Sequence, residues 1–267
     1  MSVCGVTVVQ YAPKPEVAQN LEAMAPLIAK ASDAGSHLVV FPEYSQAFSA
    51  SLGREWADRA EDDTGAFVSQ LRSLSQEHGG IVVVAGMLMS SGDDERPSNT
   101  QIAVGPEGIL ARAEKIHLYD AFGSHESTWI RPGNLESPEL FSCAGLRVGM
   151  MACYDLRFPE VTRRLVDAGV DVILTPAQWV PGENKAHHFE TLLAARAIEG
   201  QTYVVASDHP KPSGVGLSCV IDPAGVVHAR AGEGAEVLHV TLDGARVREI
   251  REANPMASAR RLGVVPL

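Results

Sequence analysis

The sequence predicts an α/β protein in which apolar strands alternate with amphipathic helices. The order β-α-β-α-β-hairpin is found twice along the 267 residues, and each hairpin turn contains Pro-x-Gly, at residues 105–108 and 222–225. Two such halves favour either a four-layer α-β-β-α sandwich of two mixed sheets or one doubly wound sheet. The pattern alone leaves both designs open.

The first half, about residues 1–115, contains the first run of predicted strands and helices. Apolar residues recur at spacings of four and three between residues 17 and 31, which defines one helix face. Thr64 is a suitable N-cap for a second helix that carries Phe67, Leu71 and Leu74, and the pair Gly79-Gly80 can end it. Strands are expected at 3–9, 38–41, 81–85, 100–104 and 109–114.

The second half, about residues 147–242, repeats this order. Helices are expected at 159–168 and 186–199, and strands at 147–152, 171–174, 203–207, 217–221 and 226–229. A strand at 238–242 and a helix at 246–253 lead into a polar C-terminal tail, 254–267. Because each half leaves an apolar sheet face open, the two faces are expected to pack together in a single domain over 1–267.

Composition and charge limit the partners. The chain has 22 Lys+Arg against 33 Asp+Glu, a net charge of −11, and no basic run, which argues against nucleic acid as a partner.

The longest apolar run, residues 79–89, is shorter than the ~20 residues that cross a bilayer. With no basic n-region at its start, the chain is expected in the cytosol, with no membrane partner. The four cysteines form no CxxC pair, so neither a metal site nor a disulfide scaffold is expected.

Cys153 is the first candidate for chemistry. It stands at the end of the predicted strand 147–152, at the strand-to-helix corner that leads to the helix predicted from residue 159. The positive end of a helix and its free N–H groups lower the pKa of a thiol and can hold an oxyanion. A buried structural cysteine is the alternative, and base rates favour it for Cys153 taken alone. Cys153 is therefore a nucleophile only if it has partners.

Two charged residues at strand ends are candidate partners. Lys115 ends the first hairpin, and a compact ammonium can hold a thiolate and then an oxyanion. Glu43 follows the strand 38–41, at the carboxyl end where ligands gather in α/β sheets, and could act as a base. Taken singly, each is better explained as a solvated surface residue. The hypothesis depends on the three residues together.

The histidines offer a Cys-His hydrolase as another hypothesis, with His117, His187 and His188 as candidate bases. None of these follows a strand end as Cys153 and Glu43 do. His187 and His188 adjoin on a predicted helix and point to different faces, unlike the i, i+4 pair of a zinc site. Packing at the helix start is the favoured role. No GxGxxG or P-loop motif supports nucleotide binding.

Three segments together resemble motifs of the nitrilase superfamily of carbon–nitrogen hydrolases. They are Phe-Pro-Glu at 41–43, Lys-Ile-His-Leu at 115–118 and Ala-Cys-Tyr-Asp-Leu-Arg-Phe-Pro-Glu at 152–160. The resemblance extends to residues 99–100, 195–205 and 216–225, and so covers nearly the whole chain. It implies the α-β-β-α sandwich rather than one doubly wound sheet, and assembly as a homodimer or higher homo-oligomer.

The resemblance also implies a role for each motif residue. Glu43 would be the general base, Lys115 the cationic oxyanion partner and Cys153 the nucleophile, with the backbone N–H of Tyr154 as a second oxyanion donor. Glu126 matches a second glutamate that many members place beside the triad to orient the substrate or the lysine. The stretch from Lys115 to Glu126 is shorter than in the related ω-amidases, which affects Glu126 and the pocket rim more than the triad.

The residues after the nucleophile resemble one branch of this superfamily. Cys-Tyr-Asp at 153–155 is similar to the branch of ω-amidases and deaminated-glutathione amidases, whereas true nitrilases usually have Cys-Trp-Glu. The resemblance implies hydrolysis of a small-molecule amide to acid and ammonia through a thioester, with no metal or cofactor. The alternatives are an N-carbamoyl amino acid hydrolase, a nitrilase, or a catalytically idle scaffold or regulatory binding protein.

Arg157 is a candidate for substrate binding. It lies four residues after Cys153, about one helical turn if the corner continues into helix. Its planar guanidinium is suited to bidentate binding of a substrate carboxylate. A structural ion pair with Asp155 or Glu160 is the alternative.

Overall fold

Two mixed sheets, packed face to face, organise the part of the chain described by the computed structural model, residues 2–51, 53–91 and 94–266. The first sheet has the order β12 (Glu236–Asp243), β1 (Val3–Gln10), β2 (Leu38–Val40), β3 (Val82–Ser91), β4 (Asp94–Gly105), β5 (Gly108–Glu114). The second has the order β11 (Val227–Arg230), β10 (Cys219–Ile221), β9 (Tyr203–Ser207), β8 (Val172–Pro176), β7 (Leu146–Met150), β6 (Phe141–Cys143).

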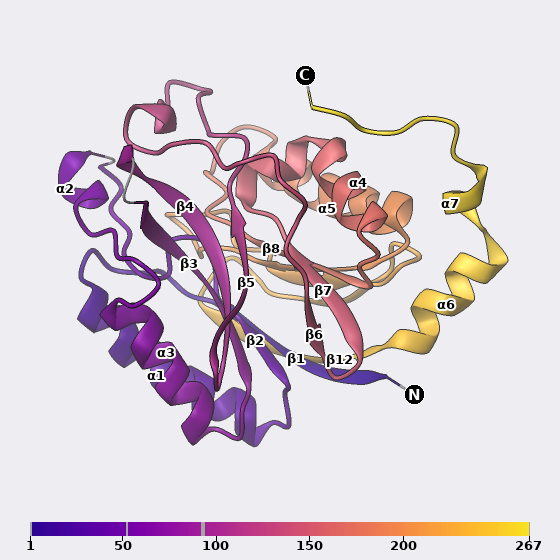
Figure 1. Ribbon diagram of the computed structural model, residues 1–267, viewed down its shortest axis with the longest axis horizontal. Coiled ribbons are helices and arrows are strands. Elements are labelled where there is room, and N and C mark those ends of the chain that lie inside the picture. Colours follow the sequence, from indigo (N-terminus) through magenta and orange to yellow (C-terminus); the bar gives the residue numbers. More distant parts are fainter. Residues whose placement is uncertain (1, 52, 92–93, 267) are drawn as a thin grey trace.

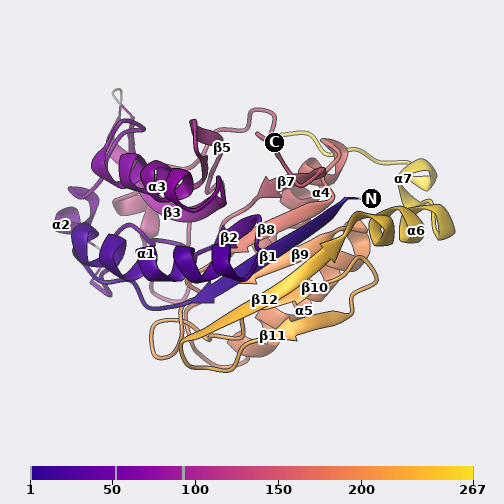
Figure 2. The same ribbon diagram turned by 90° about the horizontal axis from the view of Figure 1, so that it is seen from below.

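Helices cover the outer face of each sheet (Figures 1 and 2). Helices α1 (Val17–Asp33) and α3 (Ala66–Glu77) lie on the first sheet, and α4 (Pro159–Asp167) and α5 (Lys185–Gly200) lie on the second. The four-layer α-β-β-α sandwich of two mixed sheets is therefore confirmed, and the single doubly wound sheet is wrong.

The burial pattern of β2 shows why its sequence is a continuous apolar run. Leu38 and Val40 pack between the two sheets, against residues such as Val148 and Leu174. Val39, which points to the other face, packs with residues of α1 and α3. Because both faces of this strand are buried, the alternation of side chains gives no polar position.

The two halves of the chain are not self-contained. The last strand of the second half, β12, pairs antiparallel with β1 along its whole length, so it belongs to the first sheet. The second sheet instead gains β6, which pairs with β7 and was not predicted. The short helices α2 (Arg54–Ala57) and α7 (Met256–Ala259) were not predicted either, and α7 lies within the expected tail.

The start of α3 differs from the prediction that Thr64 caps it. The N-cap position is Gly65, and the Oε2 atom of Glu61 accepts the N–H of Phe67 at 2.9 Å. The hydroxyl of Thr64 donates instead to Oδ1 of Asp62 at 2.6 Å. A glutamate from the preceding loop therefore satisfies a free donor of the first turn, as a capping residue would.

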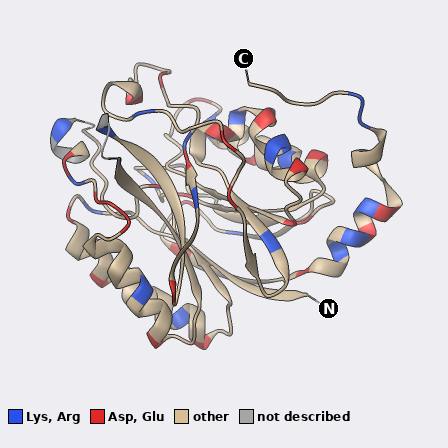
Figure 3. Cartoon of the chain, in the orientation of Figure 1, with Lys and Arg blue, Asp and Glu red and all other residues tan. Residues whose placement is uncertain are grey.

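Charged residues of both signs are interspersed on the outer elements. Figure 3 shows this along α6 (Gly244–Ala253), where Arg246 lies 3.0 Å from Glu249 in an ion pair. Within the described residues, no helix is both long and apolar enough to cross a membrane. The cytosolic location and the homodimer stay predictions.

The sheet topology brings several strand ends to one edge. In the second sheet, β7, β8 and β9 are parallel, so their carboxyl ends lie together. In the first sheet, β1, β2 and β3 are parallel, and β5 runs in the same direction because two antiparallel pairings separate it from β3. The residues that follow these ends form the site described next.

Candidate active site

Cys153 lies at a sharp turn after β7. Its φ of 41° is in the left-handed region, which is strained for a residue other than glycine and recurs at active sites. It begins the 3-10 helix η2 (Cys153–Arg157), and α4 follows at Pro159, where the sequence predicts the helix to begin. The Sγ atom donates to the carbonyl oxygen of Gln178 at 3.5 Å.

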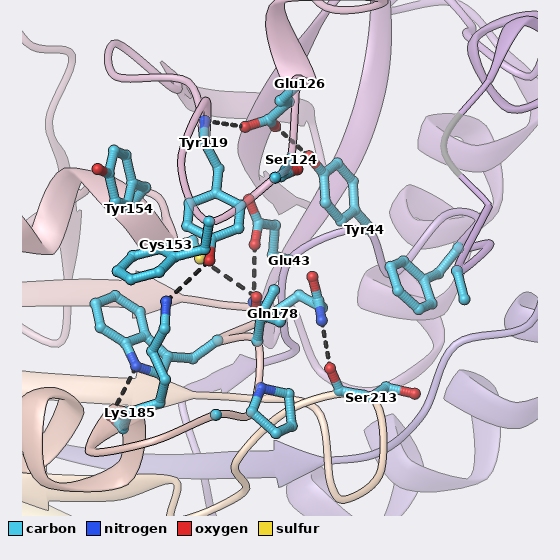
Figure 4. Close-up of a pocket in the computed structure, with 18 of the residues that line it drawn as sticks. Glu43, Tyr44, Tyr119, Ser124, Glu126, Cys153, Tyr154, Gln178, Lys185 and Ser213 are labelled. Atoms are coloured by element: carbon cyan, nitrogen blue, oxygen red, sulfur yellow. Dashed lines mark hydrogen bonds between the residues drawn. The ribbon is translucent and has the colours of Figure 1, made fainter.

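Both oxygens of the Glu43 carboxylate accept hydrogen bonds. Oε1 accepts from Nζ of Lys115 at 3.0 Å and from Nδ2 of Asn99 at 2.7 Å. Oε2 accepts the backbone N–H of Gln178 at 2.7 Å. The carboxylate and the thiol therefore both bind to Gln178, one through its N–H and the other through its carbonyl (Figure 4).

Lys115 lies between two carboxylates. Its Nζ is 3.0 Å from Oε1 of Glu43 and 2.9 Å from Oε2 of Glu126, and all three side chains are almost completely buried. Glu126 is held by the hydroxyl of Tyr44 and by the N–H of Tyr119 at 2.7 Å. The short stretch after Lys115 thus brings Glu126 to the lysine, although its role stays a prediction.

The two carboxylates have opposite pKa shifts. Burial raises the pKa of Glu43, and the negative charge of Glu126 adds to that rise, while Lys115 opposes it. Burial also acts upward on Glu126, but the ammonium of Lys115 and the hydrogen bond from Tyr44 outweigh it, so the pKa of Glu126 is lowered. When the pKa values of two neighbouring carboxyl groups differ in this way, one group can stay ionised while the other exchanges a proton.

The charges of Lys115 and Cys153 follow from the same contacts. Burial acts to lower the pKa of Lys115, but the two carboxylates outweigh it and raise that pKa well above its usual value, so the ammonium persists. Burial and the carboxylate of Glu43 raise the pKa of the Cys153 thiol well above its usual value, against the effect of Lys115. The expectation that the helix start lowers this pKa is therefore wrong, and the resting group is a thiol that needs a base.

A pocket of about 1260 Å³ opens onto these residues. Glu43, Lys115 and Cys153 line it together with Tyr119 and Trp179. Glu126, Tyr154 and Arg157, the other residues predicted for the site, also line this pocket. The N–H of Tyr154 belongs to the first turn of η2, where helix donors have no partner within the helix.

Arg157 lies in the pocket wall. Its guanidinium carbon is 4.8 Å from the centre of the Trp179 ring, and its Nη2 is 3.4 Å from Nδ1 of His188. Across the described ranges, no ion pair joins Arg157 to Asp155 or Glu160, so the alternative of an ion pair with one of these residues is wrong. Asp155 instead accepts the backbone N–H of His117 at 2.9 Å.

The histidines do not supply a base for the thiol. The ring of His117 is stacked on Phe158, with ring centres 3.6 Å apart, and bonds to Asp155 at 2.8 Å. In the described part of the chain, no histidine forms a hydrogen bond with Cys153. Nor do His, Cys, Asp and Glu side chains gather there in a group of three or more that could hold a metal ion.

Sequence reasoning missed several residues that build this site. Gln178 lies two residues after Pro176, which ends β8, and Glu43 directly follows Pro42, which comes shortly after β2. This repeat of a proline near a strand end could have indicated Gln178. Asp208, just after β9, accepts the N–H groups of Trp179 at 2.7 Å and of Val215 at 3.0 Å, and so holds two pocket loops together.

His209, next in the chain, was also missed. Its Nε2 donates to the carbonyl oxygen of Glu43 at 2.7 Å and so fixes the backbone of this residue. Burial lowers the pKa of His209 to about 4, which keeps the ring neutral. As with Asp208, its position after a strand end is the only sequence signal for it.

Comparison with known proteins points to one family. The carbon–nitrogen hydrolase family model matches residues 5–252. The chain is 36% identical to the deaminated glutathione amidase of Escherichia coli O157:H7 over 246 residues, which cover 91% of this chain and 92% of that protein.

Solved structures agree with this family. The NitFhit protein of Caenorhabditis elegans superimposes with a TM-score of 0.88 at 28% identity, over 98% of this chain and 66% of the NitFhit chain, so this chain spans only about two thirds of that protein. An amidase from Nesterenkonia sp. superimposes with a TM-score of 0.77 at 25% identity, over 96% of each chain.

Proposed function

The chain belongs to the carbon–nitrogen hydrolase family, and we propose that it is an amidase that hydrolyses deaminated glutathione or a similar amide through a thioester on Cys153. One observation carries the proposal. The buried thiol of Cys153 and the buried carboxylate of Glu43, which is paired with Lys115, both form hydrogen bonds with Gln178 and line one pocket, and Glu43 is the carboxylate with the raised pKa.

In the first step, Glu43 accepts the proton of the Cys153 thiol as Sγ forms a bond to the amide carbon. The electron pair of the C=O double bond moves to oxygen, and the ammonium of Lys115 and the N–H of Tyr154 stabilise the oxyanion. Glu126 keeps its negative charge and holds Lys115 in place, because its lowered pKa disfavours protonation.

The tetrahedral intermediate then loses its nitrogen. Glu43 returns the proton to the leaving group as the C–N bond breaks, which releases ammonia from a primary amide or an amine from a substituted one. Water next gives a proton to Glu43 and attacks the thioester carbon. The C–S bond breaks, the acid leaves, and the proton on Glu43 returns to the sulfur.

A screen for products and for the intermediate tests this proposal. The protein is incubated with deaminated glutathione, ω-amides of 2-oxo acids, N-carbamoyl amino acids and nitriles, and ammonia, amine and acid are measured. Acid quenching followed by mass spectrometry should show an acyl adduct on Cys153 with an amide. Product from carbamoyl compounds or nitriles alone would support the other branches, and no product or adduct with any compound would favour the idle scaffold.

Replacing Arg157 with lysine is expected to raise KM for a carboxylate-bearing amide by about 10-fold or more, because the bidentate fork is lost. A neutral amide of the same length should keep its KM. Steady-state kinetics with both substrates measure the difference. Equal effects on the two substrates, or lower stability with unchanged kinetics, would give Arg157 a structural role.

Replacing Gly86 with alanine is expected to lower kcat by about 10- to 100-fold, because small misplacements of catalytic groups have effects of this size. An added Cβ at this position in β3 would lie 2.5 Å from the backbone nitrogen of Tyr44 and 2.9 Å from Cα of Glu43. The backbone that carries the base must therefore shift. Gly234→Ala is the matched control, since no atom lies within 4 Å of its added Cβ. An unchanged kcat in Gly86→Ala would show that Glu43 tolerates the shift.

A further inference from the structure

Two thiols outside the active site face each other between the two sheets. Cys4 belongs to β1 of the first sheet and Cys143 to β6 of the second, and their Sγ atoms are 3.8 Å apart. Figure 1 shows the start of β1 beside the hairpin of β6 and β7. Both cysteines are free thiols. Among the described residues, those that line the active-site pocket include neither of them, so the proposed amide hydrolysis leaves this pair without a role.

The contact between the two sulfurs makes them chemically unequal. Sγ of Cys4 donates a hydrogen bond to Sγ of Cys143, and this bond lowers the pKa of Cys143 against the effect of burial. The same bond, together with burial, raises the pKa of Cys4. Cys143 is also nearer the surface, at 5% exposure against 1% for Cys4. A thiol of lowered pKa beside a second thiol is typical of a redox-sensitive pair, in which the first attacks the oxidant and the second resolves the product.

The position of β6 allows the two sulfurs to approach each other. This strand has three residues, lies at the edge of the second sheet and pairs with β7. A short edge strand opens at a lower free energy than the centre of a sheet, which also admits a small oxidant. A disulfide requires the sulfurs to move from 3.8 Å to about 2 Å. Side-chain rotation and a small shift of this edge strand supply that movement.

We propose that Cys4 and Cys143 form a reversible disulfide, a redox modification site that links the two sheets and is separate from the catalytic thiol. The oxidant is a peroxide. The thiolate of Cys143 attacks one peroxide oxygen, so an S–O bond forms as the O–O bond breaks, and hydrogen peroxide leaves a sulfenic acid and one water. Sγ of Cys4 then attacks the sulfenic sulfur. The S–S bond forms, the S–O bond breaks, and the oxygen leaves with the proton of Cys4 as a second water.

The link is expected to stabilise the fold without reaching the active site. Cys143 pairs with Leu146 at the start of β7, whereas Cys153 follows the end of that strand. The disulfide therefore lies at the opposite end of the strand from the catalytic thiol. Because it closes a long loop and so restricts the unfolded chain, oxidation should raise Tm by about 5 °C or more. Dithiothreitol should restore the original Tm.

Peptide mapping of the oxidised wild-type protein tests the proposal. The protein is treated with hydrogen peroxide and unfolded, its remaining thiols are blocked with iodoacetamide, and the digest is analysed by mass spectrometry without reduction. The expected product is a peptide that joins Cys4 to Cys143, lighter than its two parts by two hydrogens and separated by dithiothreitol. If no such peptide forms, the proposal is overturned. The same result is expected in Cys153→Ala, because the catalytic thiol takes no part.

Single variants test the order of the two steps. Cys4→Ala should stop at a sulfenic acid on Cys143, which dimedone captures, whereas Cys143→Ala should leave Cys4 as a thiol. A sulfenic acid on Cys4 in the second variant would overturn the assignment of the attacking thiol. Cys219→Ala, which removes another buried thiol, is the matched control and should keep both the linked peptide and the rise in Tm.

These readouts are independent of the proposed function and of the stability of the variants. Mapping of the wild type requires no substitution, so it decides the proposal even where a core variant fails to fold. None of the measurements depends on amide hydrolysis. The disulfide can therefore fail while the amidase stands, and the amidase can fail while the disulfide forms.

Discussion

Replacing Cys153 with alanine should abolish amide hydrolysis, with kcat lower by at least ~10⁴-fold, because no other group can form the thioester. The fold should persist, since loss of one buried sulfur costs roughly 1 kcal/mol in a core of this size. Product release, circular dichroism and the mass of the acyl adduct are the measurements.

The matched control for this variant is Cys219→Ala. Cys219 is also buried, at 3% exposure, but it lies in β10 and does not line the pocket. It should keep both turnover and the adduct on Cys153. Hydrolysis near the wild-type rate in Cys153→Ala would contradict the thioester mechanism, whereas loss of activity in both variants would indicate a general effect of core cysteines.

Replacing Glu43 with glutamine should lower kcat by at least ~10²-fold, the usual effect of losing a general base. Glutamine keeps the shape and its amide can still accept a hydrogen bond from Gln178, but it cannot take up the thiol proton. Burial raises the pKa of the Cys153 thiol, which favours the protonated form. The attack therefore depends on this proton transfer.

The pH dependence offers a second readout for Glu43. Its pKa is raised above the usual value, and only the ionised carboxylate accepts a proton. The rate of the wild type should therefore fall as the pH drops through this raised pKa, at a higher pH than for an ordinary glutamate. Glu43→Gln should lack this acid limb, whereas Glu160→Gln, an exposed residue of α4, should keep it. An unchanged profile in Glu43→Gln would assign the base elsewhere.

The sequence by itself determined most of the local elements and the three candidate catalytic residues. The pattern of apolar residues identified the strands of both sheets except β6. Side chains alternate between the two faces of a strand, so burial of one face gives alternating apolar residues and burial of both faces gives a continuous apolar run. Glu43 and Cys153 were recognisable because each follows a buried strand, and parallel strands bring their carboxyl ends to one edge. Their roles remain predictions that the variants above test.

Tertiary structure alone decided which distant segments meet. The strand β12 joins β1 across more than two hundred residues, and no local pattern specifies that partner. The three residues of β6 are too few to show a period. Glu61, from a loop, occupies the capping role predicted for Thr64 because only the folded chain places its carboxylate at the start of α3.

The charges of the pocket residues also depend on the tertiary structure. A position at a helix start predicts a lowered thiol pKa, but burial and the carboxylate of Glu43 raise the pKa of Cys153. The residues next to Cys153 in the sequence indicate neither its burial nor the nearby carboxylate. The contacts of Arg157 with Trp179 and His188 likewise depend on which side chains the fold brings near it. Sequence specifies the donors and acceptors, whereas desolvation and pairing, which set their charges, exist only once the sheets and loops have packed.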